Sequence, residues 1–471
     1  MKNVFADIHC HPTMKPYGQS FGRDTGINSP KTNNKTSIWH YDPPNLPDKI
    51  LNFVGGITRF SQTNLTALGY GNVGLICVSL YPIEKRFFNN HLGTSKVSDV
   101  VNNFITGLGK ARVDFVQSVS DYFGDLEQEY AFLQQLEGKI YAISNQQYRY
   151  VIAKNYAEIE ALLDENDPIF TIVLLITFEG CHALGTGIDP VNNPCNEVKV
   201  LANIDKIKNW PNKPLFVTFA HHFYNELCGH AKSLKGIVGT VCDQQYKLGE
   251  GFTDLGKKVA QKLLDNTDGK RIIIDVKHMS RKSRLEYFDF LASEFPHEQI
   301  PIVASHGGVC GNEQDRHLFV DEEINFYDDE LLVIAKSRGL FGVQLDERRI
   351  ASKPELENTK GEIFRKKILY NWARLVWRQI EHIAVLLDSN GLFAWDIQCL
   401  GSDYDGIVDP INGYWTSEEF QFLDDYLLKH AYNFEKSNMK NMQLETNKIS
   451  AEQIVNRFMS LNVQEFVSRN Y

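Results

Sequence analysis

Two histidines one residue apart, His9 and His11 in the segment FADIHCHP, have the spacing of a metal-binding pair. Alternate side chains of a β-strand point to the same face, so both imidazoles could reach one ion while Cys10 points away. Imidazole nitrogens are suitable ligands for Zn²⁺ and similar first-row ions. The segment therefore predicts part of a metal site whose other ligands come from elsewhere in the chain.

Further ligand-type residues stand at the ends of most of the short apolar runs in the chain. They are Glu179, His221, His222, His278, His306, Asp403 and Asp405. Taken alone, each has a structural explanation, since a lone histidine is commonly a hydrogen-bonded structural residue and GSDYDG could be a turn. Their shared placement at strand ends indicates one site. Four histidines and two carboxylates exceed the needs of one tetrahedral ion and suit two ions about 3.5–4 Å apart.

The runs that carry these residues alternate with amphipathic helical patterns. They cover 4–9, 73–81, 170–180, 215–222, 271–278, 300–306, 340–345 and 397–406. Nearly all-apolar strands that alternate with helices predict a parallel sheet covered by helices, and eight such units predict a closed (β/α)₈ TIM barrel. The strand C-termini of a barrel meet at one face, which would bring the ligands together. The alternative is an open doubly wound sheet, but no early run is followed by the Gly-rich phosphate-binding turn that such a sheet would need.

Composition and charge limit the classes of partner. The net charge is −10, whereas nucleic-acid binding depends on clustered Lys and Arg, so we expect no nucleic-acid partner. The longest apolar run, 169–178, is about half of a membrane span, so we expect no membrane insertion. Without a signal-peptide pattern, the eight scattered cysteines predict reduced thiols and a cytoplasmic protein.

We expect one hydrolase barrel over residues 1–471. Residues 12–65 are rich in Asn, Pro, Gly, Ser and Thr, which predicts a long loop insertion after the first strand. A loop of this length inside a compact protein is usually a functional lid or an insertion.

Six motifs, in order along nearly the whole chain, resemble the renal (membrane) dipeptidase family of the amidohydrolase superfamily. They are ADIHCHP, LLITFEGCHALG, FVTFAHHFYNELCGHA, FTDLGKKVAQKLLDN with IIIDVKHMS, IPIVASHGGV, and CLGSDYDGI. Each motif is weak alone, and the specificity lies in their order. The resemblance implies a hydrolase that cleaves a small amide, such as a dipeptide, with two divalent metal ions, expected to be Zn²⁺. It also implies a possible homodimer.

The resemblance assigns a role to each matching residue. Glu179 would bridge the two ions, His9, His11 and Asp403 would complete one site, and His278 and His306 would complete the other. Asp403 would also move protons. His221 is chosen over His222 because it keeps the family's spacing from Thr218; it would contact the substrate and the developing oxyanion, with Asn225 beside it. Arg316 would hold the substrate carboxylate.

Two departures from the family pattern leave the substrate open. His11 stands where the family usually has Asp, and Lys277 stands beside His278 where the family has a small residue. Both raise the positive charge near the ions and should change the acidity of bound water. One alternative is a hydrolase of the same superfamily that acts on an N-acyl amino acid, a lactone or a phosphoester. Another is a metal-binding barrel without catalysis.

Overall fold

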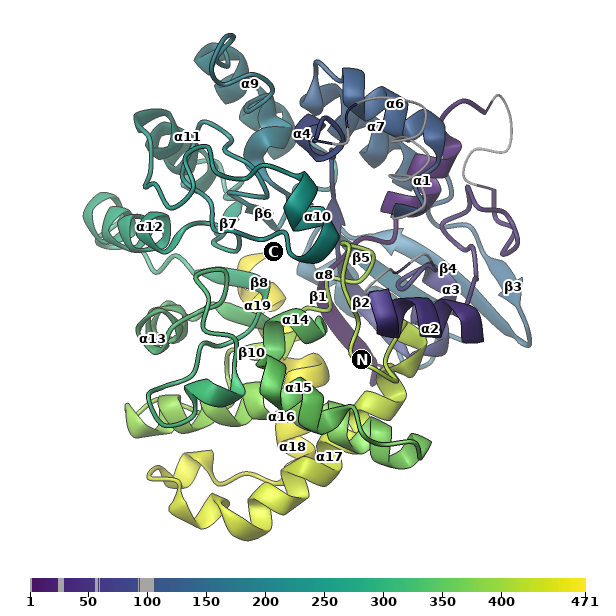
Figure 1. The fold of residues 1–471 in the computed structure, drawn as a ribbon, viewed down its shortest axis with the longest axis vertical. Helices are drawn as coiled ribbons and strands as arrows, with labels where there is room; N and C mark the ends of the chain where they lie inside the picture. The colour runs from purple at the N-terminus through teal and green to yellow at the C-terminus, as the bar shows by residue number, and fades with distance from the viewer. Residues whose placement is uncertain (1, 24–28, 56–57, 59, 92, 94–105) are drawn as a thin grey trace.

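Eight parallel strands form the centre of the molecule, in a computed structural model that describes residues 2–23, 29–55, 58, 60–91, 93 and 106–471 (Figure 1). In sheet order they are β1 (Phe5–Cys10), β2 (Val73–Leu80), β5 (Phe170–Glu179), β6 (Phe216–Thr218), β7 (Ile273–Asp275), β8 (Val303–Gly307), β9 (Leu340–Val343) and β10 (Gln398–Leu400). Each coincides with one of the eight predicted runs, and β1 and β8 extend one residue beyond theirs. The predicted (β/α)₈ barrel is therefore confirmed.

The first and last strands close the barrel at their C-terminal ends. The backbone N–H of Asp403 donates to the carbonyl of His9, and that of His11 donates to the carbonyl of Tyr404, both at 2.9 Å. The closure excludes the open doubly wound sheet. A stretch with the spacing GxGxxG, at 69–74, leads into β2 and includes its first two residues, whereas a nucleotide-binding turn follows a strand.

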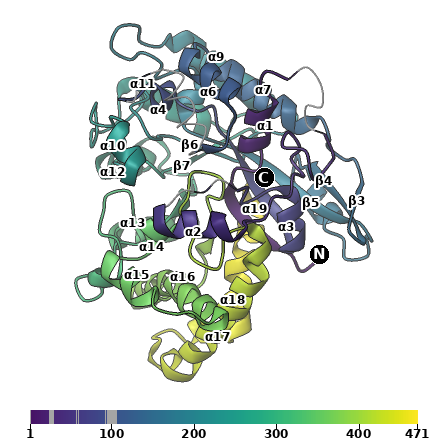
Figure 2. The same cartoon turned by 45° about the vertical axis from the view of Figure 1, so that its right-hand side comes forward.

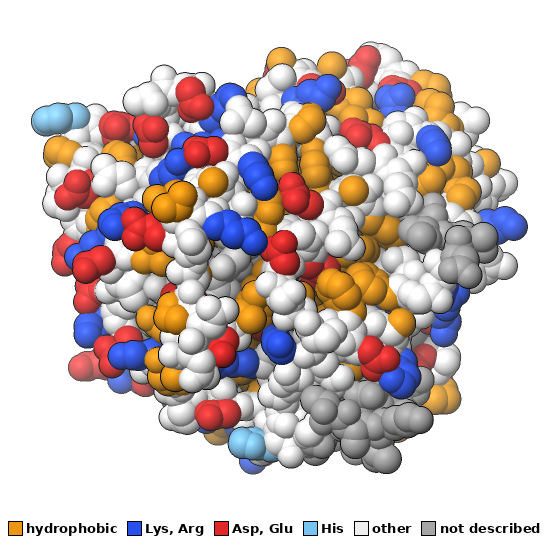
Figure 3. Space-filling model, turned by 90° about the horizontal axis from the view of Figure 1, so that it is seen from above, with side chains coloured by type: hydrophobic (Ala, Val, Ile, Leu, Met, Phe, Trp, Pro, Cys, Tyr) orange, Lys and Arg blue, Asp and Glu red, His pale blue; other side chains and the backbone are white. Residues whose placement is uncertain are grey.

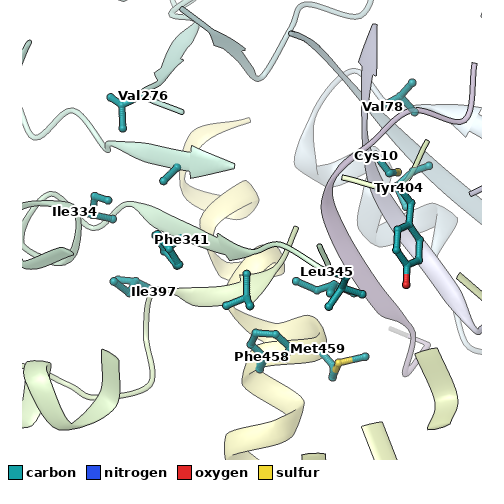
Figure 4. Close-up of a cluster of buried hydrophobic side chains, with 14 of the residues drawn as sticks. Cys10, Val78, Val276, Ile334, Phe341, Leu345, Ile397, Tyr404, Phe458 and Met459 are labelled. Atoms are coloured by element: carbon teal, nitrogen blue, oxygen red, sulfur yellow. The ribbon is translucent and has the colours of Figure 1, made fainter. Parts of the chain in front are cut away.

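The two faces of each strand pack into two different apolar clusters. Residues from all eight strands, among them Ile8, Leu75 and Val173, form an inner cluster that α19 (Asn462–Asn470) joins through Val463. The outward faces pack against the surrounding helices in the larger outer cluster, part of which is drawn in Figure 4. Burial on both faces explains why these strands read as apolar runs rather than as alternating patterns.

Helices follow the strands around the outside of the barrel (Figure 1). After β5 to β9 come α9 (Glu197–Lys208), α10 (Gly236–Val241), α11 (Asp254–Leu264), α12 (Arg281–Glu294), α13 (Asp328–Lys336), α14 (Glu347–Ile350), α15 (Lys353–Thr359) and α16 (Arg365–Ser389). Side-chain caps begin several of them; Thr253 accepts from the N–H of Gly256 in α11, and Ser280 accepts from that of Ser283 in α12. The C-terminal α17 (Phe420–Ser437) packs beside α16, and α18 (Ala451–Asn456) packs beside α17 (Figure 1).

A β-hairpin widens the sheet at one side, which the sequence analysis did not predict. It consists of β3 (Tyr141–Ile143) and β4 (Gln146–Ile152), and β4 pairs in parallel with the N-terminal half of β5. Figure 2 shows the hairpin projecting from the barrel. The same connection between β2 and β5 holds α4 (Lys85–Phe88), α6 (Lys110–Ser118), α7 (Tyr122–Gln134) and α8 (Tyr156–Leu162).

The segment 12–65 is not a loop throughout. It contains α1 (Met14–Ser20) and α2 (Leu46–Gly55), and α3 (Leu65–Tyr70) begins at its end; residues 24–28, 56–57 and 59 lie outside the described residues. Asp405, in the loop after β10, ties this segment to the barrel. Its carboxylate accepts from Lys15 at 2.7 Å and from the N–H groups of Gln62 and Thr63 at 3.1 Å.

On the face seen in Figure 3, acidic and basic side chains lie interspersed among the described residues. None of the described helices combines the length and the apolar character that a membrane crossing requires.

Candidate metal centre

Five histidines surround the carboxylate of Glu179 at the C-terminal end of the barrel. From each ring Nε2 to the nearer Glu179 oxygen, the distances are 3.6 Å for His9, 3.2 Å for His11, 3.4 Å for His221, 3.2 Å for His278 and 3.5 Å for His306. These residues stand at or just after the C-terminal ends of β1, β5, β6, β7 and β8. Residues far apart in the sequence therefore face one point.

Asp403 is the second carboxylate of the cluster. Its Oδ1 lies 3.6 Å from His9 Nε2 and 3.5 Å from His11 Nε2, and its Oδ2 lies 3.8 Å from His306 Nε2. The Gln344 amide donates to Oδ2 at 2.6 Å and fixes its orientation. The backbone of Asp403 has a φ of 59°, in a region that non-glycine residues rarely adopt. Such strain is concentrated at functional sites, where surrounding contacts maintain it.

An irregularity in β1 turns its histidines inward. The pairing of β1 with β2 shifts register between Asp7 and Cys10. Ile8 belongs to the inner apolar cluster, whereas Cys10 belongs to the outer one. Without the shift, strict alternation would place Cys10 on the same face as Ile8 and direct His9 outward. A one-residue irregularity of this kind is a common way to re-aim a side chain near an active site.

The donor set fits divalent metal ions. The seven residues, Glu179, Asp403 and the five histidines, are no more than 6% exposed. Nε2 of His9 and of His11 is buried and makes no hydrogen bond within the described part of the chain. Buried polar atoms normally have a partner, and these two nitrogens face the oxygens of Glu179 and Asp403 at 3.2–3.6 Å. A metal ion coordinated by these nitrogens together with the carboxylate oxygens would give both nitrogens a partner.

Two groups of donors lie close enough to hold one ion each. One consists of His9, Glu179, His306 and Asp403, and the other of His221, His222 and His278; within each group the donor atoms lie within 4.8 Å of one another.

Hydrogen bonds to the opposite ring nitrogens orient the histidines. His11 Nδ1 donates to the Ser79 carbonyl at 2.8 Å, so the neutral ring keeps its Nε2 lone pair for the centre. His221 Nδ1 donates to the Glu84 carboxylate, with distances of 2.9 and 3.0 Å to its two oxygens. Glu84 also accepts from the Tyr81 hydroxyl at 2.5 Å and from the N–H of His222 at 3.1 Å. This carboxylate therefore fixes both the position and the tautomer of His221.

Without metal, protons compensate the buried carboxylates. Burial lowers the pKa of His11, but Asp403 and Glu179 outweigh burial and raise that pKa to about 10. Burial is likewise outweighed at His221, whose pKa Glu84 and Glu179 raise to about 10. Burial together with the nearby charge of Glu179 raises the pKa of Asp403. Binding of divalent ions must therefore displace protons from this cluster.

Two residues assigned from the resemblance lie away from the cavity. Arg316 is in η2 (Arg316–Leu318), its side chain is 49% exposed, and it faces Asp321 at 3.5 Å. Asn225 is buried, donates to the Phe219 carbonyl at 2.7 Å and accepts from the N–H of Leu227 at 3.1 Å, so it shapes the turn after β6. Neither residue lines the cavity beside the cluster. This geometry does not support a substrate contact by either.

Two residues that contact the cluster were missed by the sequence analysis, namely Glu84 and Gln344. Glu84 stands four residues after the end of β2, and Gln344 directly follows β9. Both follow the C-terminal end of a strand, as the proposed ligands do. Their position was therefore a usable signal in the sequence, although neither is itself a proposed metal ligand.

Basic side chains line the cavity next to the cluster. Lys235, Lys277, Arg348 and Arg349 share this lining with Glu179 and Asp403. Burial, with Arg349 nearby, lowers the pKa of Lys277 to about 7. The cavity lining thus combines acidic and basic side chains.

Comparisons with known proteins bear on the fold. No protein-family model and no curated protein matches the sequence. Among solved structures, the probable dipeptidase PvdM from Pseudomonas aeruginosa is similar with a TM-score of 0.55 and 14% identity, over 99% of this chain and 96% of that one. Dipeptidase AC, described as a metallopeptidase, gives a TM-score of 0.54 and 12% identity over 100% and 99%.

A third similar structure is a metallopeptidase from Rhodobacter sphaeroides with a bound phosphinate mimic of the dipeptide L-Ala-D-Ala. It gives a TM-score of 0.53 and 13% identity over 99% of each chain. At these identities the likeness shows a shared fold along the whole chain.

Proposed function

We propose that this chain is a metal-dependent hydrolase of the dipeptidase type, which cleaves a small amide at a centre of two divalent ions, with zinc as the expected metal. The observation that carries the proposal is the ring of five histidines and Asp403 around Glu179. The dipeptidases that share the fold, and the six motifs in the same order, favour an amide as the substrate.

Glu179 is suited to bridge two ions, because histidines face both of its oxygens: Oε1 faces His9, His278 and His306, and Oε2 faces His11 and His221. When bound, two such ions would supply an activated water near neutral pH and would polarise the scissile carbonyl. Every other part of the proposed mechanism is carried by side chains of the protein.

Asp403 is the proposed proton carrier. Its Oδ1 faces the histidines and its Oδ2 is held by Gln344, so the carboxylate can accept a proton from the attacking water and deliver it to the leaving amine. No covalent intermediate is required by this arrangement.

His221 is the proposed oxyanion donor. Its Nδ1–H is fixed by Glu84, so donation from Nε2 requires the imidazolium form, which the Glu84 carboxylate stabilises. Loss of a donor of this kind typically lowers the rate by about 10²–10³.

The test is elemental analysis of the purified protein combined with hydrolysis of a panel of L-L and L-D dipeptides. About two zinc ions per chain with dipeptide turnover would support the proposal. Bound ions without dipeptide turnover would redirect the search to N-acyl amino acids, lactones and phosphoesters, which His11 and Lys277 leave open. Bound ions without turnover of any class would favour the non-catalytic barrel. Failure to bind metal after reconstitution would overturn the proposal.

A homodimer is a separate proposal, based on the family resemblance alone. Sedimentation equilibrium of the metal-loaded protein tests it.

A further inference from the structure

Four basic residues that line the cavity are here called its basic wall: Lys235, Lys277, Arg348 and Arg349. Two of them are paired with a carboxylate. Arg348 is neutralised by Asp346, with Nη2–Oδ2 and Nε–Oδ1 distances of 2.6 and 2.9 Å. Lys235 pairs with Glu322 at 2.9 Å. Within the described residues, the two remaining cations of this wall, Lys277 and Arg349, form no ion pair with a carboxylate that is not already paired.

Lys277 is buried beside His278 without an ion pair among the described residues. It is 1% exposed, and its Nζ donates to the backbone carbonyl of Ile324 at 3.1 Å. A single neutral acceptor leaves two of the three ammonium N–H bonds free for another partner.

Arg349 is also a buried cation with unused hydrogen-bond donors. It is 6% exposed, and its Nη2 donates to the Ser233 carbonyl. Its Nη1 is buried, makes no hydrogen bond within the described part of the chain, and lies 3.9 Å from Glu322, which already pairs with Lys235. The guanidinium group therefore has unused donors at the wall of the cavity.

Buried cations without anionic partners are costly, because the interior cannot replace the water that they lose. Lys277 has no ion pair among the described residues, and the carboxylate near Arg349, Glu322 at 3.9 Å, already pairs with Lys235. A ligand group that brings negative charge would remove this cost. Guanidinium donors match a carboxylate in particular, since they can bind both of its oxygens.

We propose that Lys277 and Arg349 form an anion subsite in the metal cavity, and that the substrate carries two carboxylates on its leaving portion, as in an amide of an acidic amino acid. The proposal rests on the proposed hydrolase function. Lys235 pairs with Glu322 and Arg348 with Asp346, which leaves Lys277 and Arg349 as the donors that two carboxylates of a ligand would engage.

Binding is tested first, because it does not depend on turnover. The metal-loaded protein is titrated calorimetrically with glutarate, a dicarboxylate, and with butyrate, its monoanionic counterpart. We expect glutarate to bind at least about 10-fold more tightly, in line with one further buried charge pair. Equal affinity for the two probes would overturn the subsite. Tight binding of inorganic phosphate without a preference for glutarate would overturn the assignment to carboxylates.

Variants then locate the preference. Lys277→Met and Arg349→Gln should each lose it, whereas Arg349→Lys should keep a part of it. The matched controls are Lys282→Met on α12 and Arg469→Gln on α19, both exposed, which should keep the full preference. Metal content is measured for each variant, so that loss of an ion is not mistaken for loss of the subsite. Retention of the preference in both test variants would refute the assignment. If a variant fails to fold, the comparison of glutarate with butyrate on the unaltered protein still tests whether the anion subsite exists.

Hydrolysis of Ala-Glu against Ala-Gln separates this inference from the proposed function. We expect kcat/KM to favour Ala-Glu by about 10-fold or more, since one charge distinguishes two substrates of nearly equal size. A preference for glutarate without hydrolysis of any dipeptide would keep the subsite and reject the dipeptidase. Turnover of both dipeptides at equal kcat/KM would keep the dipeptidase and reject the subsite.

Discussion

Two buried clusters of charged residues in this molecule differ in how they are balanced. In the first, Arg112 of α6 holds Asp125 of α7 through two hydrogen bonds of 2.7 Å, and the Tyr17 hydroxyl of α1 donates to the same carboxylate at 2.9 Å. In the second, the imidazoles around Glu179 stand 3.2–3.6 Å from its oxygens, and two Nε2 atoms have no hydrogen-bond partner in the described residues. The first cluster is paired within the protein, whereas the second keeps buried donor atoms that the proposed metal ions would engage.

The largest expected effect comes from Glu179→Gln, which removes the proposed bridge. We expect loss of at least one ion and a fall in kcat by about 10³ or more, because metal ions supply several kcal/mol of transition-state stabilisation. Metal analysis and steady-state kinetics measure these losses. A Glu179→Gln protein with two tightly bound ions and full activity would show that the bridge is wrongly assigned.

Asp125→Ala should lower the stability of the fold and leave the metal content unchanged. It leaves Arg112 buried and unpaired, so we expect the free energy of unfolding to fall by about 3–5 kcal/mol. Urea denaturation measures the change. Metal content per folded chain should stay unchanged, and a loss of metal in this variant would mean that the two clusters are coupled.

Glu84→Gln should lower metal affinity or kcat by about 10–100-fold, as is typical when a carboxylate that orients a histidine is replaced. The amide can accept from His221 Nδ1 but no longer stabilises the imidazolium. If His221 acts as a donor in that form, kcat in Glu84→Gln should fall off at a lower pH than in the unaltered protein. An unchanged pH profile would assign Glu84 to packing alone.

The smallest effect concerns the stability of the metal-free chain. The pKa of His11 and of His221 is raised from 6.5 to about 10. The protonated forms of these two histidines therefore stabilise the folded metal-free chain fully below pH 6.5, and this stabilisation is lost as the pH rises toward 10. We expect the Tm of the metal-free protein to fall by on the order of a few degrees across this interval. The metal-loaded protein should not show this dependence, and parallel thermal melts with and without a chelator compare the two.

The sequence predicted the barrel well because its strands are specified locally. A run such as VGLICVSL in β2 is buried at every position, and such runs stand out without knowledge of their neighbours. The hairpin β3–β4 was missed because Gln146 and Gln147 interrupt its apolar pattern, and its pairing with β5 is set by tertiary contact.

The site was predicted unevenly for a related reason. The structure brings together every residue proposed as a ligand, since each stands at the end of a strand whose direction the fold determines. Arg316 and Asn225 lie in connections between strands and helices, where position depends on long-range packing that the sequence does not encode locally. Arg349 was not considered, because it lies in α14, six residues after the end of β9.

The closing hydrogen bonds between His9 and Asp403 have a consequence for how the protein is made. The residues of the centre are spread from the first strand to the last, so a growing chain on the ribosome holds its histidines long before Asp403 is synthesised. The centre cannot assemble until the final strand closes the barrel. The full set of donor residues therefore exists only in chains that extend past residue 403, and prematurely terminated chains lack it.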